Sequence, residues 1–161
     1  MPFQKIENAI NTCKFHLNSL NVNQAKEEVE TYLVSALVLL IISEYEELIE
    51  RLFAERAILC GDSHITQYVK SSISQKFRSP DLGKITEILG KFGGTYKDNF
   101  SKAILETEYH SAWDSIMRAR HAIVHKRGPI NITFNELLSS YVKTTTVIDE
   151  LKRTLGITWI S

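Results

Sequence analysis

The chain has 161 residues, enough for one domain with a hydrophobic core and short for two independent ones. Hydrophobic residues make up 43% and charged residues 24%, which is typical of folded globular proteins and excludes a disordered or fibrous chain. Lysine plus arginine and aspartate plus glutamate are equal at 19 each, so no bulk positive charge is present to hold nucleic acid. We therefore predict one domain over residues 1–161, in which any RNA contact comes from a local patch.

The first half of the chain predicts three helices, because its apolar residues recur at the spacing of a helix face. The second is the longest and is expected to be the central helix of the fold. Gly61 supplies its C-terminal stop, and Asp62 or Ser63 caps the helix that follows. The three helices are expected at about 3–20, 24–59 and 62–77.

The second half continues the helical pattern and adds clear boundary signals. A Ser79-Pro80-Asp81 turn opens a helix that Gly93-Gly94 closes, Gly128-Pro129 ends a later one, and Thr133 with Glu136 has the spacing of a capping box. No strand-like alternation or internal repeat occurs. The fold class is therefore all-α, a bundle of about five to seven helices with one long central helix. The later helices are expected at about 82–92, 96–105, 107–126 and 134–155.

Several features favour a reducing cytoplasm and no membrane. Cys13 and Cys60 have no CxxC spacing, which argues against a disulfide framework and against a zinc site. The first 14 residues lack the apolar core of a secretory signal. The most apolar stretch, 33–42, is about half the roughly 20 residues that a membrane span needs, so we interpret it as part of a buried helix.

The helix expected at 107–126 contains an anomalous arginine. At about 100° per residue, Arg120 falls in the middle of its apolar arc. A guanidinium there is costly unless an anion or hydrogen-bond acceptors meet it. Either Arg120 pairs with Glu44 or Glu47 of the long helix, or it faces a phosphate in a cleft. The arc consists of Tyr109, Trp113, Ile116, Ile123 and Val124.

Histidines and further cations flank Arg120 on the same helix. His121 and His125 lie near three further cations in the sequence, namely Arg118, Lys126 and Arg127. These residues give a neutral protein a basic end of a helix that could bind RNA backbone. The alternative is that they form a solvated charged face. Histidines at i and i+4 can also bind zinc. No H-E-x-x-H pattern or nearby carboxylate accompanies them, so we predict no metal and no cofactor.

The segment Arg120-His121-Ala122-Ile123-Val124-His125 resembles the R-x4-H motif of the HEPN superfamily. The long acidic second helix, Gly128 and the Thr133-Phe134 opening of the last helix look most like the RiboL-PSP branch. The resemblance covers roughly residues 27–155, and the six-residue motif is its specific part. It implies a metal-independent endoribonuclease that works as a homodimer, with two copies of the motif facing each other across a cleft.

The chemistry of RNA cleavage suits these residues. Attack by the 2′-hydroxyl of RNA needs a base, positive charge at the phosphorane and help for the leaving 5′-oxygen. His125 suits the proton step and Arg120 the phosphate, while His121 orients the phosphate, donates to the leaving oxygen or caps local backbone. Arg120 and His125 lie about 140° apart on a regular helix. Two motifs, or a helix that ends before His125, would bring them together.

The activity implied is that of a toxin or defence effector, restrained by an antitoxin or regulatory protein. The alternative is a noncatalytic HEPN-like dimer that binds RNA or protein, in which Arg120 is structural. The long second helix has an acidic run, and its glutamates are expected to pair with Arg51 on the helix surface rather than to catalyse. The run consists of Glu44, Glu46, Glu47 and Glu50. Four aromatics are expected in the core rather than stacked on bases: Phe92, Tyr96, Phe100 and Tyr109.

Overall fold

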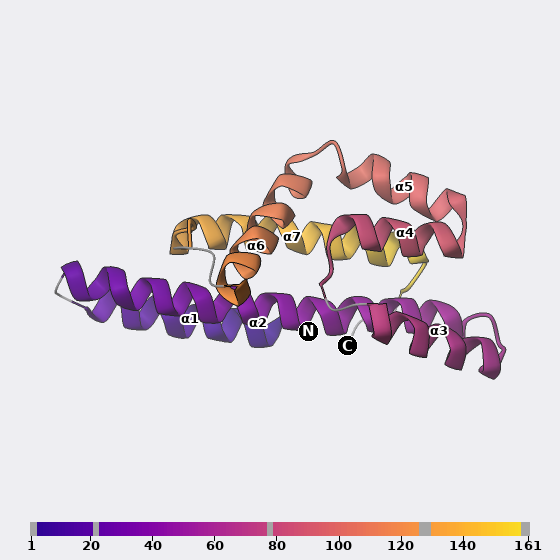
Figure 1. The fold of residues 1–161 in the computed structure, drawn as a ribbon, viewed down its shortest axis with the longest axis horizontal. Helices are drawn as coiled ribbons and strands as arrows, with labels where there is room; N and C mark the ends of the chain where they lie inside the picture. The colour runs from indigo at the N-terminus through magenta and orange to yellow at the C-terminus, as the bar shows by residue number, and fades with distance from the viewer. Residues whose placement is uncertain (1–2, 21–22, 77–78, 126–129, 159–161) are drawn as a thin grey trace.

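The computed structural model describes residues 3–20, 23–76, 79–125 and 130–158, and the regular secondary structure in those segments is entirely helical (Figure 1). This confirms the predicted all-α bundle with one long helix. No described helix is both long enough and apolar enough to cross a membrane. The helices are α1 (Gln4–Ser19), α2 (Asn23–Ile58), α3 (Ser63–Lys76), α4 (Leu82–Phe92), α5 (Gly94–Ile104), α6 (Glu108–His125) and α7 (Phe134–Leu155).

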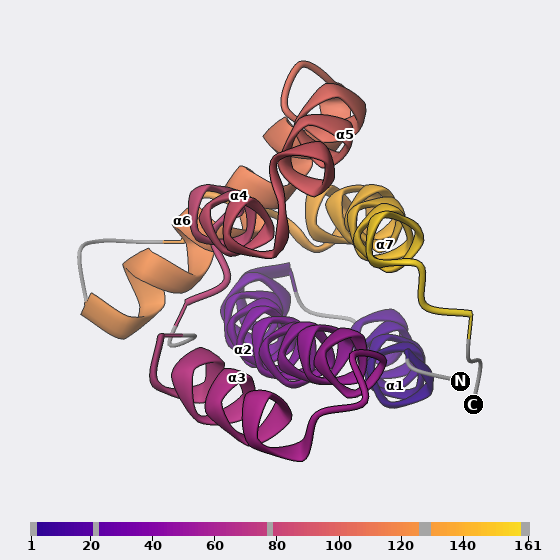
Figure 2. The same cartoon turned by 90° about the vertical axis from the view of Figure 1, so that its right-hand side faces the viewer.

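The 36-residue helix α2 lies at the centre, and α1, α3, α6 and α7 all pack against it. Adjacent residues such as Leu37 and Val38 are both buried. Because neighbours on a helix point about 100° apart, α2 must be covered on more than one side. In Figures 1 and 2, α1 and α3 accompany α2 in one layer, α4, α5 and α7 form a second, and α6 crosses steeply between them.

The helix boundaries follow the signals in the sequence closely. Asp62 Oδ1 accepts hydrogen bonds from the backbone N–H groups of His64 (2.8 Å) and Ile65 (3.1 Å), and Thr133 and Glu136 form the predicted capping box. Helix α5 begins at Gly94, two residues earlier than expected. The reason is Gly93, whose φ of 151° turns the chain within one residue. The predicted Gly128-Pro129 stop lies outside the described residues.

Tyr45 of α2 connects three helices in the middle of the core. Its ring stacks on Trp113 of α6, with the ring centroids 5.2 Å apart and the planes 9° from parallel. Its hydroxyl is 2.8 Å from Thr144 Oγ1 of α7. Because the Thr144 hydroxyl donates to the Tyr141 carbonyl (2.8 Å), the Tyr45 hydroxyl is the donor in the bond to Thr144. Burial raises the pKa of Tyr45 far above its usual range, so this hydroxyl stays protonated.

This donor assignment predicts unequal effects of the two single substitutions. Tyr45→Phe removes one hydrogen bond and should lower the free energy of unfolding by about 0.5–1.5 kcal/mol. Thr144→Val leaves the buried Tyr45 hydroxyl without an acceptor and should cost about 1–3 kcal/mol. Urea unfolding should rank the double variant as more stable than Thr144→Val alone. The exposed Tyr32→Phe serves as a control and should change nothing, whereas equal losses from the two single substitutions would contradict the assignment.

Candidate functional site

Helix α6 carries the R-x4-H motif, and its environment changes along its length. The buried side of its first turns consists of Ala112, Trp113, Ile116 and Ala119. Beyond these residues the end of α6 projects from the bundle (Figure 2). Val124, which the helical arc placed in the core, is 50% exposed, while Ile123 still packs against the core. The prediction for Val124 was wrong because an ideal arc takes no account of where the covering helices stop.

Arg120 is half-buried and faces α2. Its Nη2 lies 3.7 Å from Glu46 Oε1, and the two side chains are only 21% and 26% exposed. The structural partner is therefore Glu46, not Glu44 or Glu47. Glu44 projects from another side of α2 and accepts a hydrogen bond from Lys5 of α1. The expectation that this acidic run serves surface pairing with Arg51 is thus wrong for Glu44 and Glu46, which contact other helices.

The Glu46 carboxylate is poorly solvated for a charged group. Its Oε1 is buried and accepts no hydrogen bond from the described residues, since the contact to Arg120 is too long for one. Burial raises the pKa of Glu46, and Glu50 adds to the rise, whereas Arg120 and Lys84 oppose it. Glu46 therefore holds Arg120 in place at some cost to stability, because the ion pair does not fully repay the loss of water.

His121 and His125 lie together on the exposed face of α6. Their ring centroids are 4.3 Å apart, as expected for residues one helical turn from each other. Helix α6 includes His125, so of the two arrangements that would bring Arg120 and His125 together, an early end of the helix does not occur. Within the described residues, no group of three or more histidine, cysteine, aspartate or glutamate side chains is placed to hold a metal ion.

A cavity of about 730 Å³ brings the motif residues together. Arg120, His121 and His125 all line it, and so does the predicted RNA-binding residue Arg118. One wall thus carries two guanidinium groups and two imidazoles, although the protein as a whole is neutral. Lys126 and Arg127, the other two predicted RNA-binding residues, lie outside the described residues.

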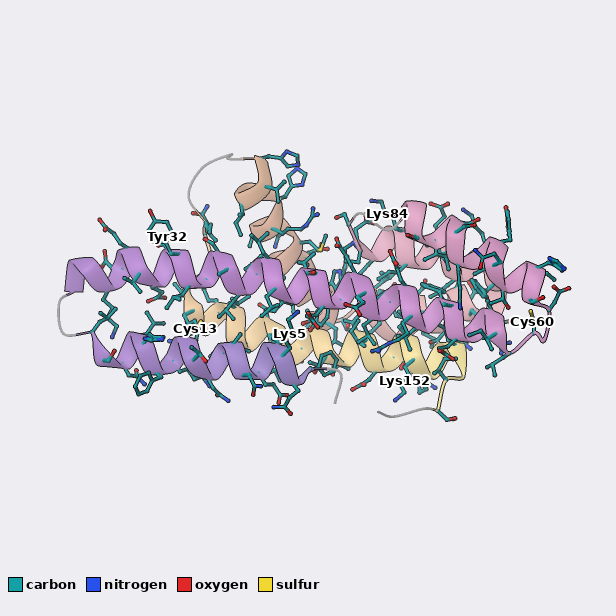
Figure 3. The ribbon with its side chains drawn as sticks, turned by 90° about the horizontal axis from the view of Figure 1, so that it is seen from below. Lys5, Cys13, Tyr32, Cys60, Lys84 and Lys152 are labelled. Atoms are coloured by element: carbon teal, nitrogen blue, oxygen red, sulfur yellow. The ribbon has the colours of Figure 1, made fainter. Side chains whose placement is uncertain are left out.

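The opposite wall comes from the start of α4, which the sequence did not identify as part of the site. Asp81 caps α4 by accepting from the Lys84 N–H (2.8 Å), and Lys84 Nζ lies 3.4 Å from Asp81 Oδ2. Both side chains line the cavity. Trp113 Nε1 donates to the Pro80 carbonyl (2.9 Å) and so fixes this turn beside α6. In Figure 3, Lys84 lies on the side of the bundle from which α6 projects.

Asp114 is an additional charged cavity residue that a pattern could have found. It precedes Arg118, His121 and His125 at i, i+4, i+7 and i+11, which places all four on one helix face. It also lies 3.5 Å from the His110 imidazole, measured from Oδ2 to Nε2. The cavity therefore contains carboxylates as well as cations, so it is a polar mixed-charge site rather than a uniformly basic one.

The comparison with known families agrees with this architecture. The family model for RiboL-PSP-HEPN matches residues 3–156. Because the match covers almost the whole chain, the protein belongs to the RiboL-PSP-HEPN family. No curated protein and no solved structure matches the chain.

The raised pKa of Glu46 predicts a substitution that stabilises the fold. A carboxyl with a raised folded-state pKa weakens the fold as pH rises from about 4.5 through that pKa. Glu46→Gln removes this penalty, so its melting temperature at pH 7 should exceed that of the parent. The difference in melting temperature between Glu46→Gln and the parent should disappear below pH 4.

Glu136→Gln is the matched control with the opposite sign. Hydrogen bonds from Thr133, the backbone N–H first, lower the pKa of Glu136, so its charged form stabilises the fold above the usual carboxyl range. Melting curves should show this variant to be less stable than the parent at pH 7 and equal to it in acid. A lower melting temperature of Glu46→Gln at pH 7 would contradict the electrostatic account of Glu46.

Proposed function

We propose that the protein is a metal-independent endoribonuclease whose site is built from two R-x4-H motifs in a homodimer. The observation that carries the proposal is the shared cavity of Arg118, Arg120, His121 and His125 in a chain of zero formal net charge. A phosphodiester is the biological group that matches such a local cluster of guanidinium and imidazole donors. Family membership supports the same class of activity.

The proposed reaction needs no external cofactor. One imidazole accepts the proton of the RNA 2′-hydroxyl, whose oxygen attacks the adjacent phosphorus. The P–O5′ bond breaks, and the leaving 5′-oxygen receives a proton from the second imidazole or from the other motif. The products are a 2′,3′-cyclic phosphate and a 5′-hydroxyl. His125 is assigned the base role, His121 the acid or phosphate-orienting role, and Arg120 stabilises the phosphorane charge.

Two features support assembly of the site from two chains. Arg120 is held half-buried against Glu46, whereas His125 is exposed at the projecting end of α6. The exposed imidazoles can therefore enter the cavity of a second copy, and a twofold dimer would place the two projecting ends opposite each other. Lys84 extends the positive surface and is assigned to RNA backbone, together with Arg118, Lys126 and Arg127.

The second candidate is a noncatalytic HEPN dimer that binds RNA or a protein. The Arg120–Glu46 contact favours it, because Arg120 already has a carboxylate partner within its own chain and needs no phosphate as a counterion. The nuclease of the first proposal would act in the cytoplasm and would require restraint by an antitoxin or regulatory protein. A binding module has no such requirement. Cleavage by defined variants separates the two candidates.

The first experiment is cleavage of end-labelled single-stranded RNA in excess EDTA. The parent chain should produce 2′,3′-cyclic phosphate ends. His125→Ala and Arg120→Ala should each lower the rate by about 10²-fold or more, as expected for lost transition-state donors. His16→Ala removes an exposed imidazole from α1 and should leave the rate unchanged. Absence of cleavage, or equal cleavage by His125→Ala, would shift the assignment to the noncatalytic dimer.

Mixing of two inactive variants tests the composite site. Arg120→Ala and His125→Ala chains, unfolded together and refolded, should form mixed dimers in which one chain supplies the arginine and the other the histidine. Cleavage should return to well above that of either variant alone. Sedimentation at micromolar concentration should show the dimer. A monomer by sedimentation, or no recovery in mixed dimers, would refute the two-chain site while leaving the fold unaffected.

A further inference from the structure

A second hollow lies at the other end of α4 from the R-x4-H cavity. It has a volume of about 560 Å³ and is bounded by the end of α2, one side of α3 and the end of α4. Ile88 and Phe92 of α4 and Ala57 of α2 supply part of its apolar lining. We call this hollow the α3–α4 groove. The volume is within the range of about 300–1,000 Å³ typical of ligand pockets.

The lining of the groove on α3 is a continuous stripe. Its residues occur at i, i+3, i+4, i+7 and i+8, which is the periodicity of a single helix face. The stripe covers two turns, roughly 12 Å at 1.5 Å per residue. Ile73 at its inner edge is buried, whereas Ile65 and Tyr68 are 51% and 72% exposed. The stripe consists of Ile65, Tyr68, Val69, Ser72 and Ile73.

The stripe has no helix packed over its outer part. Of the described helices, α2 is the only one in extended backbone contact with α3. Figure 2 shows α3 and α4 on neighbouring sides of α2 and apart from each other, and residues of both helices line the groove as its separated walls. Leu59, 61% exposed, adds apolar surface on the α2 side. Large apolar side chains gathered around one open groove indicate an interaction site rather than ordinary surface.

The charged residues that line the groove are Arg56 and Lys91, both cations. Arg56 is half-buried, donates to the Tyr96 hydroxyl (2.6 Å) and lies 5.4 Å from the centroid of the same ring. Among the described residues it forms no ion pair with a carboxylate, whereas Lys91 is paired with Glu87 (2.5 Å). A half-buried guanidinium that is fixed in place and lacks a counterion is complementary to a carboxylate on the occupant.

We propose that the α3–α4 groove docks an amphipathic α-helix of a partner protein, with an aspartate or glutamate beside its apolar face. Apolar side chains at i, i+3 or i+4 and i+7 of that helix would pack along the α3 stripe, and the acidic residue would meet Arg56. The length of the stripe and the openness of the groove match an elongated helix better than a compact small molecule. This docking site is independent of RNA cleavage.

Selection from a displayed library of randomised helical peptides, about 15 residues long, tests the proposal on the full chain. Enriched peptides should combine a helical apolar stripe with aspartate or glutamate beside it. Calorimetry should then show that Arg56→Gln and Tyr68→Ser each weaken binding by about 10-fold or more. Circular dichroism checks that both variants keep the helical fold. Decanoate, a small amphiphilic carboxylate, should bind more weakly than the peptides.

Tyr32→Ser is the matched control. Tyr32 is 76% exposed, about as much as Tyr68. Cys60 lines the groove, and Tyr32 lies far from Cys60, on the opposite part of α2 (Figure 3). This variant should bind the peptides with unchanged affinity. The proposal is overturned if no peptide is enriched, or if the enriched peptides carry lysine or arginine beside their own apolar stripe. It is also overturned if both groove variants bind the peptides as well as the parent does. Tighter binding of decanoate than of any peptide would reassign the groove to a small ligand.

Discussion

The contact that holds the architecture together is the insertion of Tyr45 between α6 and α7. Its ring stacks on Trp113 and its hydroxyl donates to Thr144, so one side chain of α2 fixes the helix that bears the motif and the helix that closes the bundle. Trp113 in turn donates to the Pro80 carbonyl and so places the start of α4 beside α6. Both walls of the R-x4-H cavity are therefore positioned through one buried chain of contacts. This network favours a single arrangement because the buried Tyr45 hydroxyl and the Trp113 indole N–H would each lose their acceptor in another one.

Placement of charge, rather than its amount, defines the candidate site. The chain is formally neutral, yet the end of α6 and the first turn of α4 gather guanidinium, imidazole and ammonium groups around one cavity. Glu46 is the counterion of Arg120 in this site: its half-buried carboxylate holds Arg120 at the cavity and is itself partly removed from water. Such a carboxylate restricts Arg120 to one region before any ligand arrives. Preorganisation of this kind lowers the entropy lost when a phosphate binds.

The sequence predicted the helices well because their boundaries have local causes, such as the Asp62 cap and the Thr133–Glu136 capping box. It also placed Arg120, His121 and His125 on one helix and predicted that the two histidines share a face. It failed where the answer depends on how helices cross. Glu46, not Glu44 or Glu47, meets Arg120, and Lys84 reaches the cavity from another helix. Periodicity shows which face of one helix is apolar. It does not show which residue of a distant helix lies opposite that face, or how far along the face the neighbouring helices pack.

Helix α4 physically connects the two hollows of the molecule. Its first turn presents Lys84 to the R-x4-H cavity, and its last turn presents Ile88 and Phe92 to the α3–α4 groove. Lys84 and Phe92 are eight residues apart, so these two lining positions are separated by only about 12 Å along the helix axis. An occupant of the groove would thus touch the same rigid element that carries part of the other site. Contact alone does not regulate, because an occupant shifts an equilibrium only if it binds one arrangement of α4 more tightly than another. The anchoring of α4 at both ends, by the Trp113–Pro80 bond and by packing of Phe92 on Phe53, limits such arrangements to small displacements.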